Sequence, residues 1–513
     1  DERYRKHPPG AAVWLSRLMG EAVSTDTYTP QQRTRYRQQL NNDLEVFDQH
    51  LQKAEFGNRG TIGLELELNL VDEDMQPALK GQEVLAQLGD EYQSEIGMYN
   101  VELNHPPLSV AGDGLRQLHG GISSRLAEVQ AAAEKVGARV AMIGTLPTVT
   151  PEFLADPSWM TPENRYRGLN NAIMQSRGEL VHIDLSNEEE CRLDFDDIAP
   201  ESTCTSMQLH LQVPPDRFTH AWNASQAMAS VQVALAANSP LFLGRKLWHE
   251  SRIPVFQQAI DTRTPELVAQ GVRPRVWFGE RWITSVFDLF EENVRYFSPL
   301  LPEDRGASGE PVFEGQSPTL HHLNLHNGTV WRWNRPIYAP GKPRAHIRVE
   351  NRILPAGPTV TDIVADSAFY YGLVKYLSSE TRPVWSRLTF KDAEQNFFYA
   401  ARAGMFARLD WPTLGRIDVA TLIQDHLLEQ AREGLRALDV DEDLITQNLD
   451  IIRERARTRQ NGAMWQLRTV KALTPAGSKP DSPERRAALA EMLRRYLENQ
   501  ATGKPVHTWK ITP

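Results

Sequence analysis

Four short segments of the chain alternate apolar and polar residues in the way expected of β-strands; they cover residues 61–70, 100–104, 206–213 and 346–353. Successive side chains of a strand point to opposite faces, so residues two apart share a face. If the four strands belong to one sheet, their apolar sides join the core and their polar sides form a common face. That polar face carries Gly63, Glu65, Glu67, Asn69, Asn100, Glu102, Asn104, Ser206, Gln208, His210, Gln212, His346, Arg348, Glu350 and Arg352.

This polar face differs from an ordinary solvated one because it gathers glutamate, histidine and arginine and contains no lysine. Glu65 and Glu67 are like-charged neighbours, an arrangement that is unfavourable unless a cation neutralises them. Mg²⁺ prefers carboxylate oxygens, and a guanidinium group matches phosphate oxygens in a bidentate fork. One such strand alone is equally well explained as an amphipathic surface strand, whereas four together favour a metal–nucleotide site.

Helical patterns flank these segments. Thr29, Pro30 and Gln32 have the arrangement of a capping box with a proline in the first turn, which predicts a helix from here to about Phe56. Arg165 and Tyr166 stand where a loop is expected to lead into a short helix. Further helices are expected over residues 113–140 and 219–237 and over almost all of 361–497.

These elements predict an α+β protein in three parts. We expect an N-terminal helical segment (1–57), a catalytic α+β core (58–360) and a helical C-terminal region (361–513) packed on that core. Residues 302–318, rich in Gly, Pro, Ser and Glu, are expected to form a mobile loop that could act as a lid. The acidic stretch 187–197 is expected to be a solvated loop or hairpin.

Composition narrows the class of protein. The net charge of −10 over 513 residues argues against a general nucleic-acid binder or a membrane-surface binder, because both need a basic excess. No apolar run is long enough for a membrane span. Cys191 and Cys204 are the only cysteines, so no disulfide framework is indicated and a cytoplasmic location is expected.

Several motifs follow one another in an order that is more specific than any one of them. They are Gly63-Leu-Glu-Leu-Glu67, Glu102, Arg165-Tyr166, Thr205-Ser-Met-Gln-Leu-His210, Ala237-Asn-Ser-Pro-Leu-Phe-Leu-Gly244, Arg252 with Asp261-Thr-Arg263, Trp331 to Arg335, Arg348-Val-Glu-Asn-Arg352 and Asn461-Gly-Ala-Met-Trp-Gln466. Over about residues 58–400 this set resembles the type 2 glutamate–cysteine ligases, a carboxylate–amine ligase family related in fold to glutamine synthetase.

The resemblance implies an active site on the polar concave face of a bent antiparallel sheet. ATP and Mg²⁺ (or Mn²⁺) would activate the carboxylate of L-glutamate as an acyl phosphate, which an amine such as L-cysteine then attacks. The resemblance assigns the metal ligands Glu65, Glu67, Glu102, His210 and Glu350, the catalytic residues Glu350 and Arg352, the ATP-binding residues Gln208, Arg348 and Arg352, and the substrate-binding residues Arg165, Tyr166, Arg335, Arg252 and Asp261.

Other interpretations stay open at this point. His210 could be a hydrogen-bonded core histidine, Glu350 with Arg352 a structural ion pair, and His346 a residue outside the site. The acceptor amine could differ from cysteine, since the chain has longer N- and C-terminal helical regions than smaller members of the family. A guanidino kinase uses a related sheet but more arginines, and a regulatory nucleotide-binding protein would have lost the acidic set. The sequence does not indicate an oligomeric state.

Overall fold

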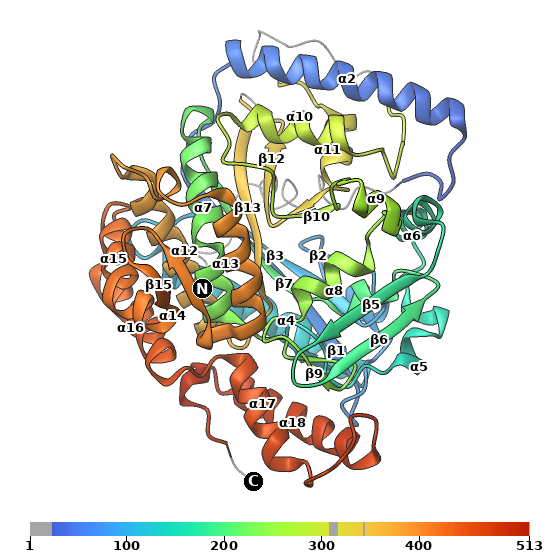
Figure 1. The fold of residues 1–513 in the computed structure, drawn as a ribbon, viewed down its shortest axis with the longest axis vertical. Helices are drawn as coiled ribbons and strands as arrows, with labels where there is room; N and C mark the ends of the chain where they lie inside the picture. Colours follow the sequence, from blue (N-terminus) through green and yellow to red (C-terminus); the bar gives the residue numbers. More distant parts are fainter. Residues whose placement is uncertain (1–22, 307–316, 342–343, 512–513) are drawn as a thin grey trace.

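The computed structural model describes residues 23–306, 317–341 and 344–511 (Figure 1). Most of the predicted lid, residues 307–316, lies outside the described residues, as does the beginning of the predicted N-terminal segment. Within the described ranges, no helix is both long enough and apolar enough to span a bilayer.

The centre of the molecule is a seven-stranded sheet in which every pair is antiparallel. Four of its strands are those predicted from the alternating segments: β1 (Thr61–Val71), β3 (Asn100–Ser109), β7 (Ser206–Gln212) and β13 (His346–Pro355). The others are β2 (Tyr92–Ser94), β4 (Arg139–Ala141) and β12 (Asn334–Ala339). The strand order is β12-β13-β7-β1-β3-β2, with β4 also pairing with β1. The predicted α+β class is confirmed.

The pairing register aligns the polar positions of neighbouring strands. The aligned pairs are Glu65 with Gln208, Glu67 with Glu102, and His210 with Glu350. Between Asn351 and Leu354 the pairing of β13 with β7 shifts, and Arg352 lies in this irregular stretch. Because these strands are far apart in sequence, the register is what turns four separate polar sides into one continuous surface.

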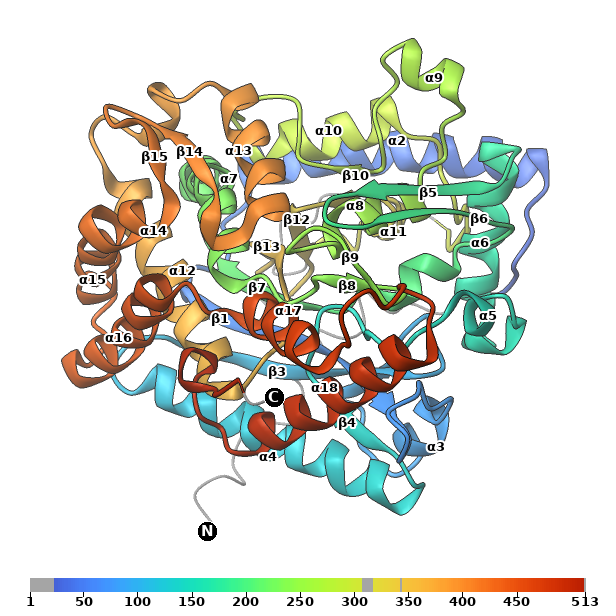
Figure 2. The same cartoon turned by 60° about the horizontal axis from the view of Figure 1, so that its bottom comes forward.

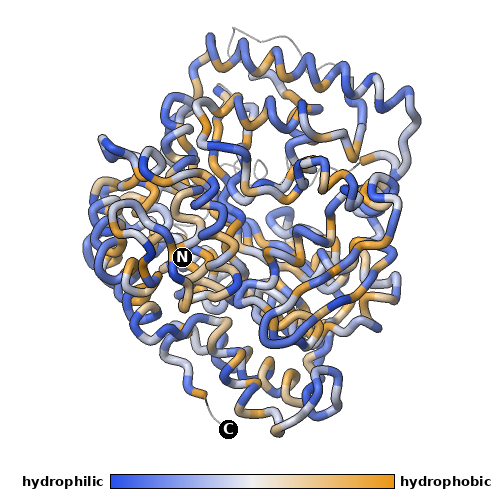
Figure 3. Tube along the Cα trace, in the orientation of Figure 1, coloured by the Kyte–Doolittle hydropathy of each residue, from blue (hydrophilic) through white to orange (hydrophobic). Residues whose placement is uncertain are grey.

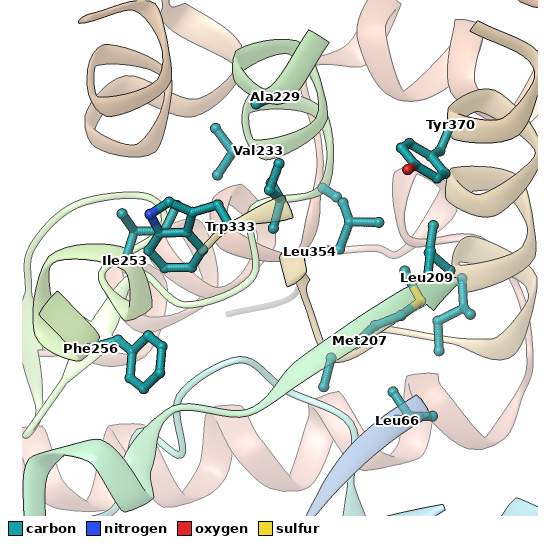
Figure 4. Packing of buried hydrophobic residues seen from close by; sticks show 14 of the residues in the cluster. Leu66, Met207, Leu209, Ala229, Val233, Ile253, Phe256, Trp333, Leu354 and Tyr370 are labelled. Atoms are coloured by element: carbon teal, nitrogen blue, oxygen red, sulfur yellow. The ribbon is translucent and has the colours of Figure 1, made fainter. Parts of the chain in front are cut away.

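The apolar side of the sheet packs against buried helices. Met207 and Leu209 of β7 face side chains of α7 (Pro215–Ala236) such as Val233, and Tyr370 of α12 (Val360–Ser379) closes the same layer (Figure 4). Both helices are apolar around most of their circumference, as expected for helices that are covered on all sides. The sheet is therefore held firmly from behind while its polar side faces the cleft described below.

The remaining helices lie around the sheet and its two buried helices (Figures 1 and 2). At one end α2 (Pro30–Lys53) lies beside α10 (Val286–Tyr296) and α11 (His321–Asn327), and the predicted capping box of Thr29 and Gln32 is present. In Figure 3, most of α2 is coloured as hydrophilic and short hydrophobic stretches recur along it, which agrees with the burial of Tyr36, Leu40 and Phe47. The other helices are α3 (Gly81–Leu85), α4 (Gly114–Lys135), α5 (Pro151–Leu154), α6 (Asn164–Arg177), α8 (Arg252–Ala259), α9 (Pro265–Ala269), α13 (Phe390–Ala403), α14 (Val419–Leu422), α15 (Leu428–Arg436), α16 (Glu442–Thr458), α17 (Gly462–Leu473) and α18 (Pro483–Ala501).

Short strand pairs lie outside the central sheet: β5 (Val181–Ser186) with β6 (Glu190–Phe195), β8 (Leu241–Phe242) with β9 (Arg245–Lys246), β10 (Val276–Trp277) with β11 (Trp331–Arg332), and β14 (Arg408–Trp411) with β15 (Gly415–Asp418). The acidic stretch 187–197 is part of the β5–β6 hairpin, one of its two predicted forms. The prediction of nearly continuous helix after residue 361 is wrong at β14–β15, because Gly415 has a positive φ (66°) and makes a tight hairpin turn possible. The division at residues 57 and 360 stays a prediction.

Candidate functional site

A cleft of about 790 Å³ lies over the polar side of the central sheet. Its floor is formed by residues of β1, β3, β7, β12 and β13: Glu65, Glu67, Glu102, Gln208, Arg335 and Arg352. One wall comes from α6 and from the turn between β2 and β3, and includes Arg165, Tyr166, Leu169 and Glu95. A second wall includes Leu301, Arg305, Thr329 and Trp331. Acidic and arginine side chains thus line the same cavity.

Two groups of acidic or histidine side chains lie at this surface. The first consists of Glu65, His210 and Glu350, with potential ligand atoms all within 4.8 Å of one another. His210 Nε2 lies 3.0 Å from Glu65 Oε1, and Arg348 Nε donates to His210 Nδ1 at 2.9 Å. Because a guanidinium can only donate, this bond leaves the proton of a neutral His210 on Nε2, facing Glu65. Metal ligation through Nε2 would require His210 to give up its bond from Arg348.

Of the two carboxylates in the first group, Glu350 is the one that two arginines bond. Arg335 donates to it through Nε at 2.6 Å and Nη2 at 3.2 Å, and Arg352 Nη1 donates at 3.3 Å. Its complete burial favours the neutral acid, but these two arginines outweigh the effect and lower the pKa of Glu350 to about 2. Glu350 is therefore an anion that fixes the position of two guanidinium groups.

The second group consists of Glu67, Glu95 and Glu102, again with ligand atoms within 4.8 Å of one another. Glu67 accepts hydrogen bonds from Ser206 N at 2.5 Å, from Ser206 Oγ at 3.0 Å and from Gln208 Nε2 at 3.0 Å. Glu102 accepts one from Asn104 Nδ2 at 2.9 Å. These bonds orient the carboxylates but leave their mutual repulsion without a cation in this group.

That repulsion is visible in the pKa values. Burial is the largest cause and proximity of other glutamates adds to it, so the pKa of Glu95 rises to about 8 and the pKa of Glu102 rises well above 4.5. Burial also raises the pKa of Glu67, and that of Glu201 in the same cleft rises to about 8. Carboxylates crowded in this way favour a bound divalent cation, because the cation removes the cost of ionising them together.

Arg352 links the two groups. Its Nη1 donates to Gln208 Oε1 as well as to Glu350, and its charge also interacts with Glu67 and Glu65. Burial alone would lower the pKa of Arg352, but the acidic neighbours outweigh it and raise the pKa. A planar cation held between two acidic groups in an open cleft is well placed to meet a phosphoryl group there.

The structure separates the predicted site residues into three sets. Arg165, Tyr166 and Arg335 line the cleft together with the acidic groups. Arg348 is buried beside His210, and its Nη1 also contacts His346 Nε2 at 3.1 Å, so His346 lies next to the first group.

Arg252 and Asp261 do not line the cleft. Arg252 is buried, bonds Glu250 Oε1 at 3.1 Å and lies 5.7 Å from the ring centre of Trp333. Asp261 forms a two-bond pair with Arg263, at 2.9 and 2.7 Å. Of the two tryptophans in the same region, Trp331 forms cleft wall and Trp333 is core.

Glu95 and Glu201 were missed by sequence reasoning. Glu95 lies in the turn after the three-residue strand β2, and Glu201 lies in a 3₁₀ turn before β7. Neither belongs to an alternating run, so no periodic signal marked them. The only sequence signal for Glu95 is that it is an acidic residue seven positions before Glu102, in the turn that connects β2 to β3.

Clustered carboxylates and arginines share the floor of one cleft. The chain belongs to glutamate-cysteine ligase family 2, whose pattern matches residues 61–469, and it is a ligase of the glutamate–cysteine ligase type. No curated protein matches the chain. The predicted family resemblance is confirmed.

Two solved structures give weaker comparisons. A glutamate–cysteine ligase from Francisella tularensis in complex with AMP is 10% identical, with a TM-score of 0.49 over 89% of this chain and 97% of that one. A bifunctional glutathione synthetase from Pasteurella multocida is 12% identical, with a TM-score of 0.45 over 91% of this chain and 55% of that one. The family assignment rests on the sequence match.

Proposed function

We propose that the protein is an ATP- and Mg²⁺-dependent ligase that activates the carboxylate of L-glutamate as an acyl phosphate and joins it to an amine, with L-cysteine as the first acceptor. The observation that carries this proposal is the pair of acidic groups joined by Arg352. Glu65, Glu67, Glu95 and Glu102 line one cleft, and His210 and Glu350 are buried beside them. Family membership supports it. We also propose that the sheet is glutamine synthetase-like and, because ATP is available there, that the reaction is cytoplasmic.

The second acidic group fits a divalent cation best. Glu67, Glu95 and Glu102 converge within 4.8 Å. Burial raises their pKa values and neighbouring carboxylates add to the rise for Glu95 and Glu102, although Arg352 and Arg165 act in the opposite direction on Glu67 and Glu95. In the first group Glu65 is the more available ligand, since Glu350 is occupied by two arginines. Bound Mg²⁺ would supply neutralisation of phosphate charge at this floor.

Anion recognition is assigned to the arginines. Arg352 would contact the phosphoryl group in transit, and Gln208 holds its Nη1 in place. Arg348 Nη2 is buried and has no hydrogen-bond partner among the described residues, which fits a further contact to ATP once it binds. Arg165 and Tyr166 on α6, with Arg335 on the floor, would hold the substrate amino acids.

The reaction follows from these positions. A glutamate carboxylate oxygen attacks the γ-phosphorus of ATP, and ADP leaves. The amine nitrogen then attacks the acyl carbon, inorganic phosphate leaves and the nitrogen loses its proton. Charge builds on the transferring phosphoryl group in the first step, and a fixed guanidinium such as Arg352 stabilises it without reorganisation.

The decisive experiment measures ADP release with glutamate constant while cysteine, other amino acids and simple amines are supplied in turn. ADP release that depends on both glutamate and one amine supports the proposal and identifies the acceptor. Hydroxylamine should trap a γ-glutamyl hydroxamate when the amine is omitted. A stable phosphorylated guanidine, or ADP release independent of glutamate, would contradict the ligase and favour a kinase.

A further inference from the structure

Residues 23–29 run from α6 to the beginning of α2 and are not among the residues that line the cleft. Figure 1 shows this segment descending from α2 to lie beside α6. Val23 at its start is buried, and Thr29 at its end caps α2. The cleft chemistry described above does not use this segment, which we call the N-terminal strap.

On one side the strap is attached to α6. Asn164 Nδ2 donates to Ser24 O at 3.1 Å, and Asn171 Nδ2 donates to Asp26 O at 3.5 Å. Arg167 Nε lies 3.5 Å from a carboxylate oxygen of Asp26. These three residues span two turns of the helix that carries Arg165 and Tyr166 into the cleft.

On the other side the strap is attached to the second wall, mainly through Glu303. Ser24 N donates to Glu303 Oε1 at 3.3 Å, and Tyr28 Oη donates to Glu303 Oε2 at 3.4 Å. Glu303 follows Leu301 and precedes Arg305, which both line the cleft. Residues on either side are held by α2, where Arg33 donates to Pro299 O at 3.3 Å and Arg35 pairs with Asp304 at 2.6 Å.

The two walls also approach each other directly at Gly168 of α6. A Cβ atom there would lie 3.1 Å from Leu301 Cδ2 and 3.3 Å from Asp26 Cα. Since both contacts are tighter than ordinary van der Waals distance, α6, the strap and the second wall form one closely packed junction. A change in the strap therefore reaches both walls at once.

We propose that the N-terminal strap sets the distance between the two cleft walls, and that Glu303 is the positioning residue that fastens it. Among the described residues the Glu303 side chain bonds to Ser24 and Tyr28 and to no residue of the proposed metal or phosphate site. It acts through the strap, which holds α6 in the position where Arg165 and Tyr166 line the cleft. The kinetic consequence rests on the proposed function; the structural consequence does not.

Glu303→Ala removes both acceptors and is the main test. Because hydrogen bonds to a charged group contribute modestly when partly exposed, we expect the KM for glutamate to rise about 3- to 10-fold. The kcat should stay near the wild-type value, since Arg352 and the acidic groups are untouched. Amide hydrogen exchange in 164–177 and 23–29 should become faster, while exchange in β1 and β7 should not change.

Three other variants complete the test. Tyr28→Phe removes one of the two bonds and should give a smaller rise in KM, and it serves if Glu303→Ala does not fold. Glu303→Gln keeps one acceptor oxygen. Its KM for glutamate should therefore rise less than that of Glu303→Ala. Glu291→Ala breaks an exposed pair with Arg295 on neighbouring α10 and should change neither readout.

The outcomes are distinguishable from one another. If Glu303→Ala shows the wild-type rate of amide hydrogen exchange in α6 and the wild-type KM for glutamate, the proposed role of the strap is wrong. A parallel fall in kcat and melting temperature, with KM unchanged, would also overturn it, because that pattern reports general destabilisation. If the wild-type protein shows no ligase activity, the proposed function fails, while faster exchange in α6 still supports the strap.

Discussion

Arg352→Lys separates catalysis from structural support at the centre of the cleft. Lysine keeps the positive charge but loses the planar fork that reaches Gln208 and Glu350 together. If Arg352 meets the phosphoryl group in transit, the loss falls on the transition state rather than on bound ATP. We expect kcat to fall by ~10²-fold or more, the scale of removing one electrostatic donor. The KM for ATP should change much less.

The structure limits the accompanying loss of stability. Glu350 keeps two bonds from Arg335 when its 3.3 Å contact with Arg352 is lost. One lost hydrogen bond to a charged group in this position costs about 1–2 kcal/mol, equivalent to about 1–2 °C in melting temperature for a chain of 513 residues. Both kcat and melting temperature are measured on the same preparation.

A matched control is Arg459→Lys, which disturbs a two-bond pair with Asp418, a residue outside the cleft lining, at 2.9 and 3.0 Å. It should lose a similar amount of stability and keep its kcat. A destabilised Arg352→Lys enzyme with wild-type kcat would refute the catalytic assignment. It would leave Arg352 as an ion-pair partner of Glu350.

Three further predictions concern metal, pH and packing. Glu95→Gln, like Glu67→Gln, should raise the Mg²⁺ concentration for half-maximal rate at least ~10-fold, and an unchanged Mg²⁺ titration would exclude Glu95 as a ligand. Without metal, the melting temperature should fall as pH rises from about 5 to about 8. The reason is that the folded state keeps the proton of Glu95 (pKa about 8, raised from 4.5), whereas the unfolded state has lost it. Mg²⁺ should reduce this slope, and a flat metal-free profile would contradict the raised pKa of Glu95. Arg252→Ala should lower the free energy of unfolding by about 3–5 kcal/mol by leaving buried Glu250 without its partner, whereas unchanged stability in urea titrations would show that the pair is dispensable.

The strands of the site could be predicted because alternation is a local property. Leu64, Leu66 and Leu68 point one way and Glu65 and Glu67 the other whatever the rest of the chain does, and the structure has β1 over this segment. The capping box at the start of α2 was equally readable, since all its atoms lie within four residues. The hairpin β14–β15 was not, because helical spacing on both sides concealed two four-residue strands.

Tertiary structure decided how the predicted residues are grouped. The five expected metal ligands fall into two groups according to the pairing register, and Glu95 joins the second group. Arg252 and Asp261 belong to motifs of the same resemblance, yet each pairs with a nearby charged residue away from the cleft.

The sequence by itself determined which side chains face the sheet surface, because strand geometry repeats every two residues. Only the fold decided which of them meet, since that depends on strand register and on the paths of the connecting segments. The attachment of Ser24 to Glu303 across 279 positions is the plainest case. No local pattern contains such a contact, and the strap is visible only after α6, α2 and the cleft walls have been placed together.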